Sequence, residues 1–176
     1  MLYTGKGDSG TTTAFGCDQT RISKSSELPE ALGAVDELNS FLGYVKTRAD
    51  EASARVVRDA QETLFIVQAE LGGAPKSVDE KKVAELEEHI AAIEQDIPPL
   101  KGFSVAGGTE LSALFDTARA IARRAERRVI ALEEAGIRTL ASATKAYLNR
   151  LSSLLFALAR KANHDADVAE ETPSYR

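Results

Sequence analysis

The chain has 176 residues, a length typical of one domain with room for a full hydrophobic core. Apolar residues make up 43% and charged residues 28%, which argues against general disorder. The net charge of −5 excludes a chain that coats nucleic acid or anionic membranes with its whole surface. A single cysteine, Cys17, excludes an intrachain disulfide framework and a zinc site made of cysteines.

The sequence contains no sign of a membrane segment. No apolar run approaches the ~18 residues that a membrane-spanning helix needs, and the N-terminal residues lack the apolar stretch of a secretion signal. No internal repeat is visible. We therefore expect one domain over 1–176 in a reducing, cytoplasmic setting.

Residues 1–27 are rich in Gly, Thr, Ser and Lys and show no helical period, which predicts a long loop or a flexible arm. Gly5, Gly7 and Gly10 match G-x-G-x-x-G, but only four residues precede them, too few for the strand of a dinucleotide site. Gly5 and Gly10 also have the Walker A spacing, but Thr11 stands at the lysine position. The local chemistry still suits phosphate, because glycine N–H groups and Thr and Lys side chains all donate hydrogen bonds.

Apolar residues recur with helical spacing in five segments that follow this loop. The predicted helices cover 28–49, 51–72, 79–96, 109–134 and 139–163. Mostly short connections and the lack of a convincing strand predict an all-α, up-and-down bundle over 28–163. A non-helical link is expected at 98–108, and a polar, loosely held tail at 164–176.

The predicted fourth helix carries an unusual charge pattern, R-A-I-A-R-R-A-E-R-R at 119–128. Helical spacing places Arg119, Arg123 and Glu126 on one stripe, which Arg127 borders, while apolar residues mark the opposite side as core. Arginine side chains bind phosphate and carboxylate groups in a bidentate manner. The stripe therefore indicates a polyphosphate or ion-paired partner, and the alternative is a solvated face with Glu–Arg pairs.

Other polar residues leave similar alternatives open. Asp36 lies one position past a core residue of the first helix, so it is either solvated or the partner of an arginine on another helix or subunit. Phe156 lies on the polar side of the last helix and hints at a subunit contact. A di-metal carboxylate bundle is argued against, because neither His89 nor His164 has a glutamate three residues before it.

Three separated segments resemble one family, the PduO-type ATP:cob(I)alamin, or corrinoid, adenosyltransferases. The first segment is Y-T-G-K-G-D-S-G-T-T-T-A-F-G and continues through Ser23 and Lys24 to G-A-V-D-E-L-N-S-F-L-G at 33–43. The second is L-K-G-F-S-V-A-G-G at 100–108, and the third combines 118–129 with 147–156. Order and spacing agree over nearly the whole chain. The resemblance implies a five-helix bundle that forms a homotrimer, with ATP and corrinoid bound between neighbouring subunits.

The resemblance also implies roles for individual residues, with 1–27 as a nucleotide-binding loop. The ATP-binding set would be Thr4, Gly5, Lys6, Gly7, Thr12, Thr13 and Lys24 in the loop, and Arg123, Glu126, Arg127 and Asn149 on the helices. Asp36 and Arg119 match residues that pair across the subunit boundary, and Phe103 matches an aromatic that crowds the lower face of the corrin. Together with Arg123, these residues would shape the catalytic geometry. Arg124 and Arg128 have weaker claims.

The implied reaction transfers the 5′-deoxyadenosyl group of ATP to Co(I) of cobalamin, which yields adenosylcobalamin and triphosphate. Cobalt is the nucleophile, so no catalytic base is needed.

Mg²⁺ is expected to bind through the ATP phosphates, with no protein ligands assigned. Neither nucleic acid nor membrane is an expected partner. A non-enzymatic ATP-sensing or adaptor oligomer is the alternative. The preferred corrinoid and a hand-off of the product to a B12-dependent enzyme are left open.

The chain departs from the family pattern at several positions. The family usually has a Lys-Thr pair where this chain has Gly5 and Lys6, and often a lysine at Ser9. Ala106 replaces a usual proline, and Leu32 replaces a common tyrosine. We therefore expect phosphate contacts in the loop to be redistributed through Lys6 and the backbone.

Overall fold

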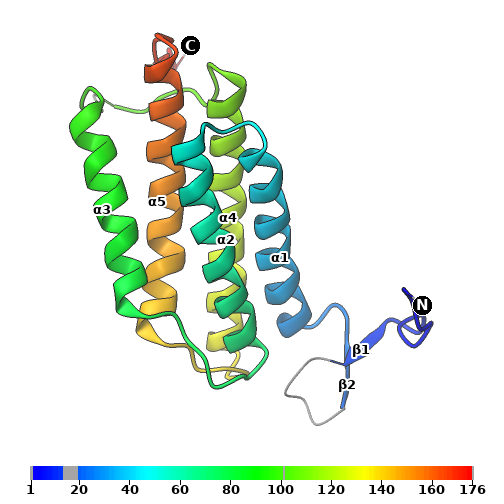
Figure 1. Cartoon of the computed structure of the whole chain (residues 1–176). Coiled ribbons are helices and arrows are strands. Elements are labelled where there is room, and N and C mark those ends of the chain that lie inside the picture. The colour runs from blue at the N-terminus through cyan, green and yellow to red at the C-terminus, as the bar shows by residue number, and fades with distance from the viewer. Residues whose placement is uncertain (1, 14–19, 101, 176) are drawn as a thin grey trace.

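The computed structural model describes residues 2–13, 20–100 and 102–175, and within these ranges it contains five helices and one small sheet. The helices are α1 (Glu27–Lys46), α2 (Glu51–Leu71), α3 (Glu80–Asp96), α4 (Glu110–Glu134) and α5 (Ser142–Asp165). They run alternately up and down beside one another (Figure 1). The predicted five-helix, up-and-down bundle is therefore confirmed. No helix in the described ranges is both long and apolar enough to cross a membrane.

The core lies where the apolar faces of the helices meet. α4 packs mainly on α5 and α1, while α3 covers another side of α5, and α2 lies against α1. Four of the helices contribute fully buried large side chains, among them Leu38 of α1, Leu64 of α2, Phe115 of α4 and Leu151 of α5. Burying each of these contributes roughly 1.5–3 kcal/mol. Because the apolar face of α4 is fixed in this way, its arginines are held toward the outside of the bundle.

The first two helices are separated by a tight turn. α1 ends at Lys46, three residues before the predicted end, because the N–H groups of Thr47 and Arg48 bond to carbonyls only three residues back. The carboxylate of Asp50 then accepts the N–H groups of Ala52 and Ser53 at 2.9 and 3.0 Å. This N-cap fixes the beginning of α2 at Glu51, the residue after Asp50.

The last helix begins and ends later than its periodicity predicts. The N–H groups of Leu140 and Ala141 bond to the side-chain carboxylates of Glu133 and Glu70, at 2.9 and 2.7 Å. The chain is therefore held extended there, and α5 begins at Ser142 rather than at 139. At its other end, α5 continues to Asp165, so the tail is two residues shorter than expected.

The expectation of no strand is wrong for the N-terminal loop. Strands β1 (Thr11–Thr13) and β2 (Arg21–Ser23) pair in antiparallel register, with Thr12 opposite Ile22. Arg21 stabilises the pair, since its Nε donates to Thr11 Oγ1 at 2.8 Å and a terminal nitrogen donates to the carbonyls of Lys6 and Thr11. Three-residue strands are too short to show an alternating pattern. Cys17 lies outside the described residues, so its role is not tested.

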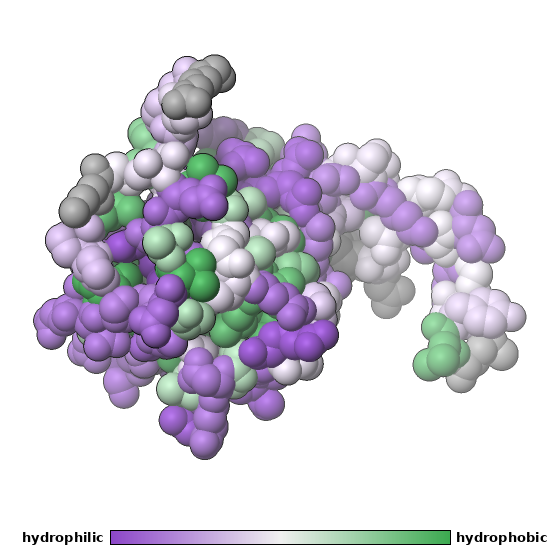
Figure 2. Space-filling view, turned by 90° about the horizontal axis from the view of Figure 1, so that it is seen from above, coloured by the Kyte–Doolittle hydropathy of each residue, from purple (hydrophilic) through white to green (hydrophobic). Residues whose placement is uncertain are grey.

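The hairpin projects from the N-terminal end of α1 and stands away from the bundle (Figures 1 and 2). Its apolar residue Ile22 packs against the edge of the core. The link between α3 and α4, residues 97–109, crosses the opposite end of the bundle (Figure 1). We call this link the 97–109 loop. The glycine-rich N-terminal segment and the 97–109 loop therefore lie at opposite ends of the bundle (Figure 1).

Candidate functional site

The arginines of α4 fall into two groups with different surroundings. Arg124 and Arg128 point toward α1, where they form ion pairs with Glu37 and Glu30, the latter at 3.8 Å. Arg123 and Arg127 are exposed, and neither has a carboxylate partner within the described ranges. Solvated Glu–Arg pairs therefore account for Arg124 and Arg128, while the described part of the chain supplies no counter-charge for Arg123 and Arg127.

Arg119 is the most enclosed of the predicted arginines. Its Nε donates to Asp116 Oδ1 at 3.3 Å, and its guanidinium carbon lies 5.9 Å from the ring centre of Phe156 on α5. This is the range of a cation–π contact. Phe156, which the sequence analysis associates with a subunit contact, packs beneath Arg119 within the same chain.

These residues line a cleft of about 350 Å³ between α4, α5 and the 97–109 loop. We call it the arginine cleft. Its lining residues are Leu100, Gly102, Phe103, Ser104, Arg119, Arg123, Ser152, Ser153 and Phe156. The side chain of Phe103 is 81% exposed. The cleft therefore combines two guanidinium groups with two aromatic rings, a lining suited to a ligand with both anionic and flat apolar parts.

A second pair of predicted residues meets one turn further along α4. Asn149 Nδ2 donates to Glu126 Oε1 at 2.9 Å, which joins α5 to α4. Asn149 Oδ1 accepts from Arg150 at 3.0 Å, and Arg150 also pairs with Glu87 on α3 at 3.0 Å. Glu126 and Asn149 are thus held beside the exposed arginines.

The glycine-rich loop forms consecutive turns. The N–H of Asp8 bonds to Gly5 O at 3.2 Å, and the N–H of Gly10 bonds to Gly7 O at 3.1 Å. Gly5 and Gly10 have φ values of +69° and +78°, a conformation that other residues rarely adopt. The Lys24 amine lies so near Gly7 that a Cβ there would be 2.9 Å from it. The glycine-rich turns and the amine of a lysine therefore meet in one small region.

Two of the predicted pairings are not formed within one chain. The glycine-rich loop lies away from the arginine cleft, since the hairpin projects from the bundle (Figure 1). Asp36 is exposed on α1, where Gln68 donates to it at 3.4 Å, and no arginine pairs with it in the described ranges. The predicted Asp36–Arg119 pair therefore stays a prediction, and so does a site that unites the glycine-rich loop with the arginines of α4.

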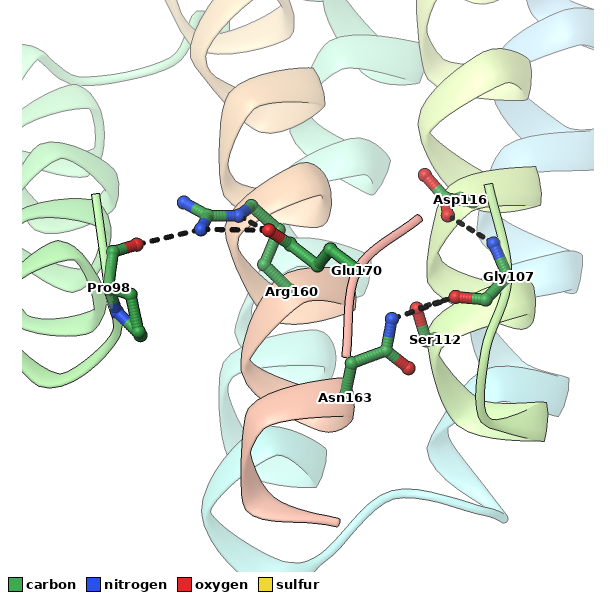
Figure 3. Close-up of polar contacts among 7 residues, drawn as sticks. All are labelled: Pro98, Gly107, Ser112, Asp116, Arg160, Asn163 and Glu170. Atoms are coloured by element: carbon green, nitrogen blue, oxygen red, sulfur yellow. Dashed lines mark hydrogen bonds and ion pairs between the residues drawn. The ribbon is translucent and has the colours of Figure 1, made fainter. Parts of the chain in front are cut away.

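The structure also shows contacts that periodicity does not reveal. Arg160 near the end of α5 donates to the carboxylate of Glu170 at 2.7 Å and to the carbonyl of Pro98 at 2.8 Å (Figure 3). The N–H of Val105 bonds to Glu171 O at 2.8 Å. The polar tail is thus tied to the 97–109 loop at two points. A cavity of about 430 Å³ lies between them, next to the arginine cleft.

The end of the bundle that holds this loop also exposes apolar surface, which interrupts a mostly hydrophilic exterior (Figure 2). Its exposed large apolar residues are Leu100, Phe103, Val105 and Val168. No cluster of three or more His, Cys, Asp or Glu residues in the described ranges is placed to hold a metal ion.

These observations define a class of protein, a five-helix bundle with an arginine-lined cleft on α4 and a glycine-rich hairpin at one end. Comparison with known proteins identifies the family. A family model described as cobalamin adenosyltransferase matches residues 2–162. The chain belongs to this cobalamin adenosyltransferase family.

Individual relatives agree with this assignment. A corrinoid adenosyltransferase of Citrobacter freundii is 39% identical over 176 residues, which cover 95% of this chain and 97% of the relative. A corrinoid adenosyltransferase of Bacillus subtilis is 37% identical, and the match covers 90% of that relative. A solved variant of the PduO-type ATP:corrinoid adenosyltransferase from Lactobacillus reuteri, complexed with cobalamin and ATP, matches 99% of both chains with a TM-score of 0.91 and 28% identity.

The chain spans 50% of the length of another relative, the corrinoid adenosyltransferase PduO of Citrobacter freundii, to which it is 37% identical.

Proposed function

We propose that this protein transfers the 5′-deoxyadenosyl group of ATP to the Co(I) centre of a corrinoid, with release of triphosphate. The observation that carries this proposal is the arginine cleft. Arg119 and Arg123 open onto the same space as Phe103, so a polyphosphate and a flat apolar ring can meet there. Family membership and the Lactobacillus reuteri complex with cobalamin and ATP support the same reaction.

In this reaction the chain's task is placement and charge compensation. The reduced cobalt attacks C5′ of ATP, the bond from C5′ to the phosphate oxygen breaks, and triphosphate leaves with the electron pair. In-line placement of the two reacting atoms lowers the barrier by several kcal/mol. Arg123 and Arg127 have no carboxylate partner in the described ranges, so they are available to the leaving polyanion. Glu126 and Asn149 would bind ATP beside these arginines.

The site in this proposal lies between two protomers of a homotrimer. The hairpin projects from its own bundle, so its glycine turn and Lys24 are available to a neighbouring chain. Asp36 is exposed on α1, and both terminal nitrogens of Arg119 lack a hydrogen bond within the described ranges. A second copy can therefore supply the carboxylate that pairs with Arg119, and the hairpin that completes the triphosphate site.

Mg²⁺ enters this proposal with the nucleotide, because the described residues form no cage for it and phosphate oxygens suit its octahedral geometry. No step of the mechanism depends on it. A cytoplasmic location is part of the proposal, since a Co(I) substrate survives only under reducing conditions.

The test compares two adjacent arginines of α4. Arg123→Ala removes a cation of the arginine cleft, whereas Arg124→Ala removes one that pairs with Glu37 on α1. Both variants and the wild type are incubated anaerobically with ATP, Mg²⁺ and cob(I)alamin, and formation of the cobalt–carbon bond is followed in the corrinoid absorption spectrum. Loss of charge-assisted hydrogen bonds predicts a rate about ten- to a hundredfold lower for Arg123→Ala and a near-normal rate for Arg124→Ala.

Circular dichroism should show equal helix content in all three proteins. No cobalt–carbon bond with the wild type would reject the activity and favour an ATP-sensing or adaptor oligomer. Wild-type turnover by Arg123→Ala would reject the role of this arginine and leave the activity standing.

A further inference from the structure

Asp116 contacts two sides of the arginine cleft, α4 and the 97–109 loop. Its side chain is 13% exposed, on the second turn of α4. Oδ1 accepts from Arg119 Nε at 3.3 Å, and Oδ2 accepts from the backbone N–H of Gly107 at 3.1 Å. One carboxylate thus contacts an arginine of the cleft and the loop that carries Phe103.

The Gly107 end of this link is firmly fixed. Its carbonyl accepts from Ser112 Oγ at 3.1 Å and from Asn163 Nδ2 at 2.8 Å, while Asp116 holds its N–H (Figure 3). Asn163 Oδ1 also accepts the N–H of Thr109 at 2.9 Å, and Asn163 is almost fully buried. The backbone N–H and carbonyl of Gly107 are therefore held from α4 and α5 together, four residues after Phe103.

At the arginine end of the link, Asp116 forms an ion pair with one edge of the Arg119 guanidinium group. Asp116 engages only Nε, and the guanidinium group lies over Phe156. Within the described ranges both terminal nitrogens remain without a hydrogen bond. An arginine side chain that is already ordered loses less conformational entropy when it binds. The two terminal nitrogens are thus presented to the cleft in one direction.

We propose that Asp116 is a positioning residue for adenosyl transfer, which orients Arg119 from an anchor on the Phe103-bearing loop. This inference rests on the proposed function. Asp116 itself need not touch either substrate. It sets the direction of Arg119 relative to Phe103, so that the two sides of the cleft keep a fixed geometry while cobalt approaches C5′.

A purely structural role is the competing explanation, because the hydrogen bond from Gly107 to Asp116 attaches the loop to α4 and thereby adds stability. The far end of α4 offers a matched control. Glu133 also accepts a backbone N–H, from Leu140 at 2.9 Å, and a cation, from Lys145 at 2.8 Å, but it lies away from the cleft. Glu133→Gln therefore repeats the chemical change of Asp116→Asn without its proposed consequence.

The experiment measures kcat and the KM values of ATP and corrinoid for the wild type, Asp116→Asn and Glu133→Gln, at a temperature below all three unfolding midpoints. Asp116→Asn is nearly isosteric, and its thermal unfolding transition verifies the fold. Loss of an oriented charge-assisted bond predicts a kcat about tenfold lower for Asp116→Asn, with the KM of ATP within about threefold of the wild type. Glu133→Gln should lower the unfolding midpoint without changing kcat.

A repeat in the Arg119→Ala background distinguishes positioning through Arg119 from other effects. If Asp116 acts through this arginine, Asp116→Asn should change the residual rate of Arg119→Ala by less than about twofold. A kcat of Asp116→Asn equal to that of the wild type would overturn the proposal, and so would an equal loss in the Arg119→Ala background. An inactive wild type would instead reject the proposed function, and the inference with it.

Discussion

At the scale of single residues, neighbouring arginines on α4 have different environments because they face different partners. Arg124 turns toward Glu37 of α1, whereas Arg123 opens into the arginine cleft beside Arg119. Helical spacing alone predicts which arginines share a stripe, and it predicts this correctly. It does not predict the two contacts of Arg119. The hydrogen bond to Asp116 depends on a side-chain rotamer, and the cation–π contact with Phe156 depends on the packing of α5 against α4.

One prediction concerns the pH dependence of the α2 N-cap. The hydrogen bond from the Ser53 hydroxyl has the largest effect on the Asp50 carboxylate and lowers its pKa below the ordinary value of 3.8. Hydrogen bonds from backbone N–H groups lower this pKa further. A lowered folded-state pKa stabilises the protein above the unfolded-state value, and this contribution is lost as the pH falls through the folded-state pKa. Asp50→Ala should therefore cost about 1 kcal/mol near neutral pH and less below pH 3.8.

Urea unfolding of the wild type and Asp50→Ala at neutral pH and at successively lower pH measures this difference directly. A free-energy gap that stayed constant, or widened, on acidification would contradict the assignment of Asp50 as an ionised cap.

At the scale of elements, the helices and the non-helical link at 98–108 were predictable, whereas the hydrogen bonds that hold the connections were not. Apolar periodicity predicts all five helices, with ends that differ by at most three residues, because their faces pack against one another. The errors fall where side chains replace helical hydrogen bonds, as at Leu140 and Ala141, or where strands are three residues long, as in the hairpin. The 97–109 loop has no repeating pattern at all, so its attachment to α4 and α5 is visible only in three dimensions.

A prediction at this scale concerns Gly108, which has a φ of +111°. A Cβ at this position would lie 2.5 Å from Asn163 Oδ1, so Gly108→Ala must displace Asn163 and strain the backbone. We expect the free energy of unfolding to fall by more than about 1 kcal/mol. Gly102→Ala in the same loop is the control, because a Cβ there meets no atom within 4 Å.

Chemical denaturation of the two glycine variants beside the wild type checks this expectation. Equal stability of Gly108→Ala and Gly102→Ala would show that Asn163 does not hold the loop as described.

At the scale of the whole molecule, the two regions proposed to bind the anionic nucleotide lie apart from each other within one chain. The glycine turn and Lys24 lie in a hairpin that projects from the bundle, while the arginine cleft lies between α4, α5 and the 97–109 loop. The sequence resemblance predicts the residues of both regions, and the structure describes each of them. In the proposed homotrimer, cyclic symmetry would unite them in a site between protomers, because every subunit would give its hairpin to one neighbour and receive one from the other.

Mixing two inactive variants tests this arrangement most directly. Lys24→Ala damages the hairpin half of the site, and Arg123→Ala damages the helical half. In randomly mixed trimers of equal amounts, one of the three sites in every mixed trimer would contain two intact halves. The rate of cobalt–carbon bond formation should therefore recover to about a quarter of the wild-type rate, although each variant alone is nearly inactive. If mixed trimers form and the rate stays at that of the separate variants, the site does not lie between protomers, and the central claim is wrong.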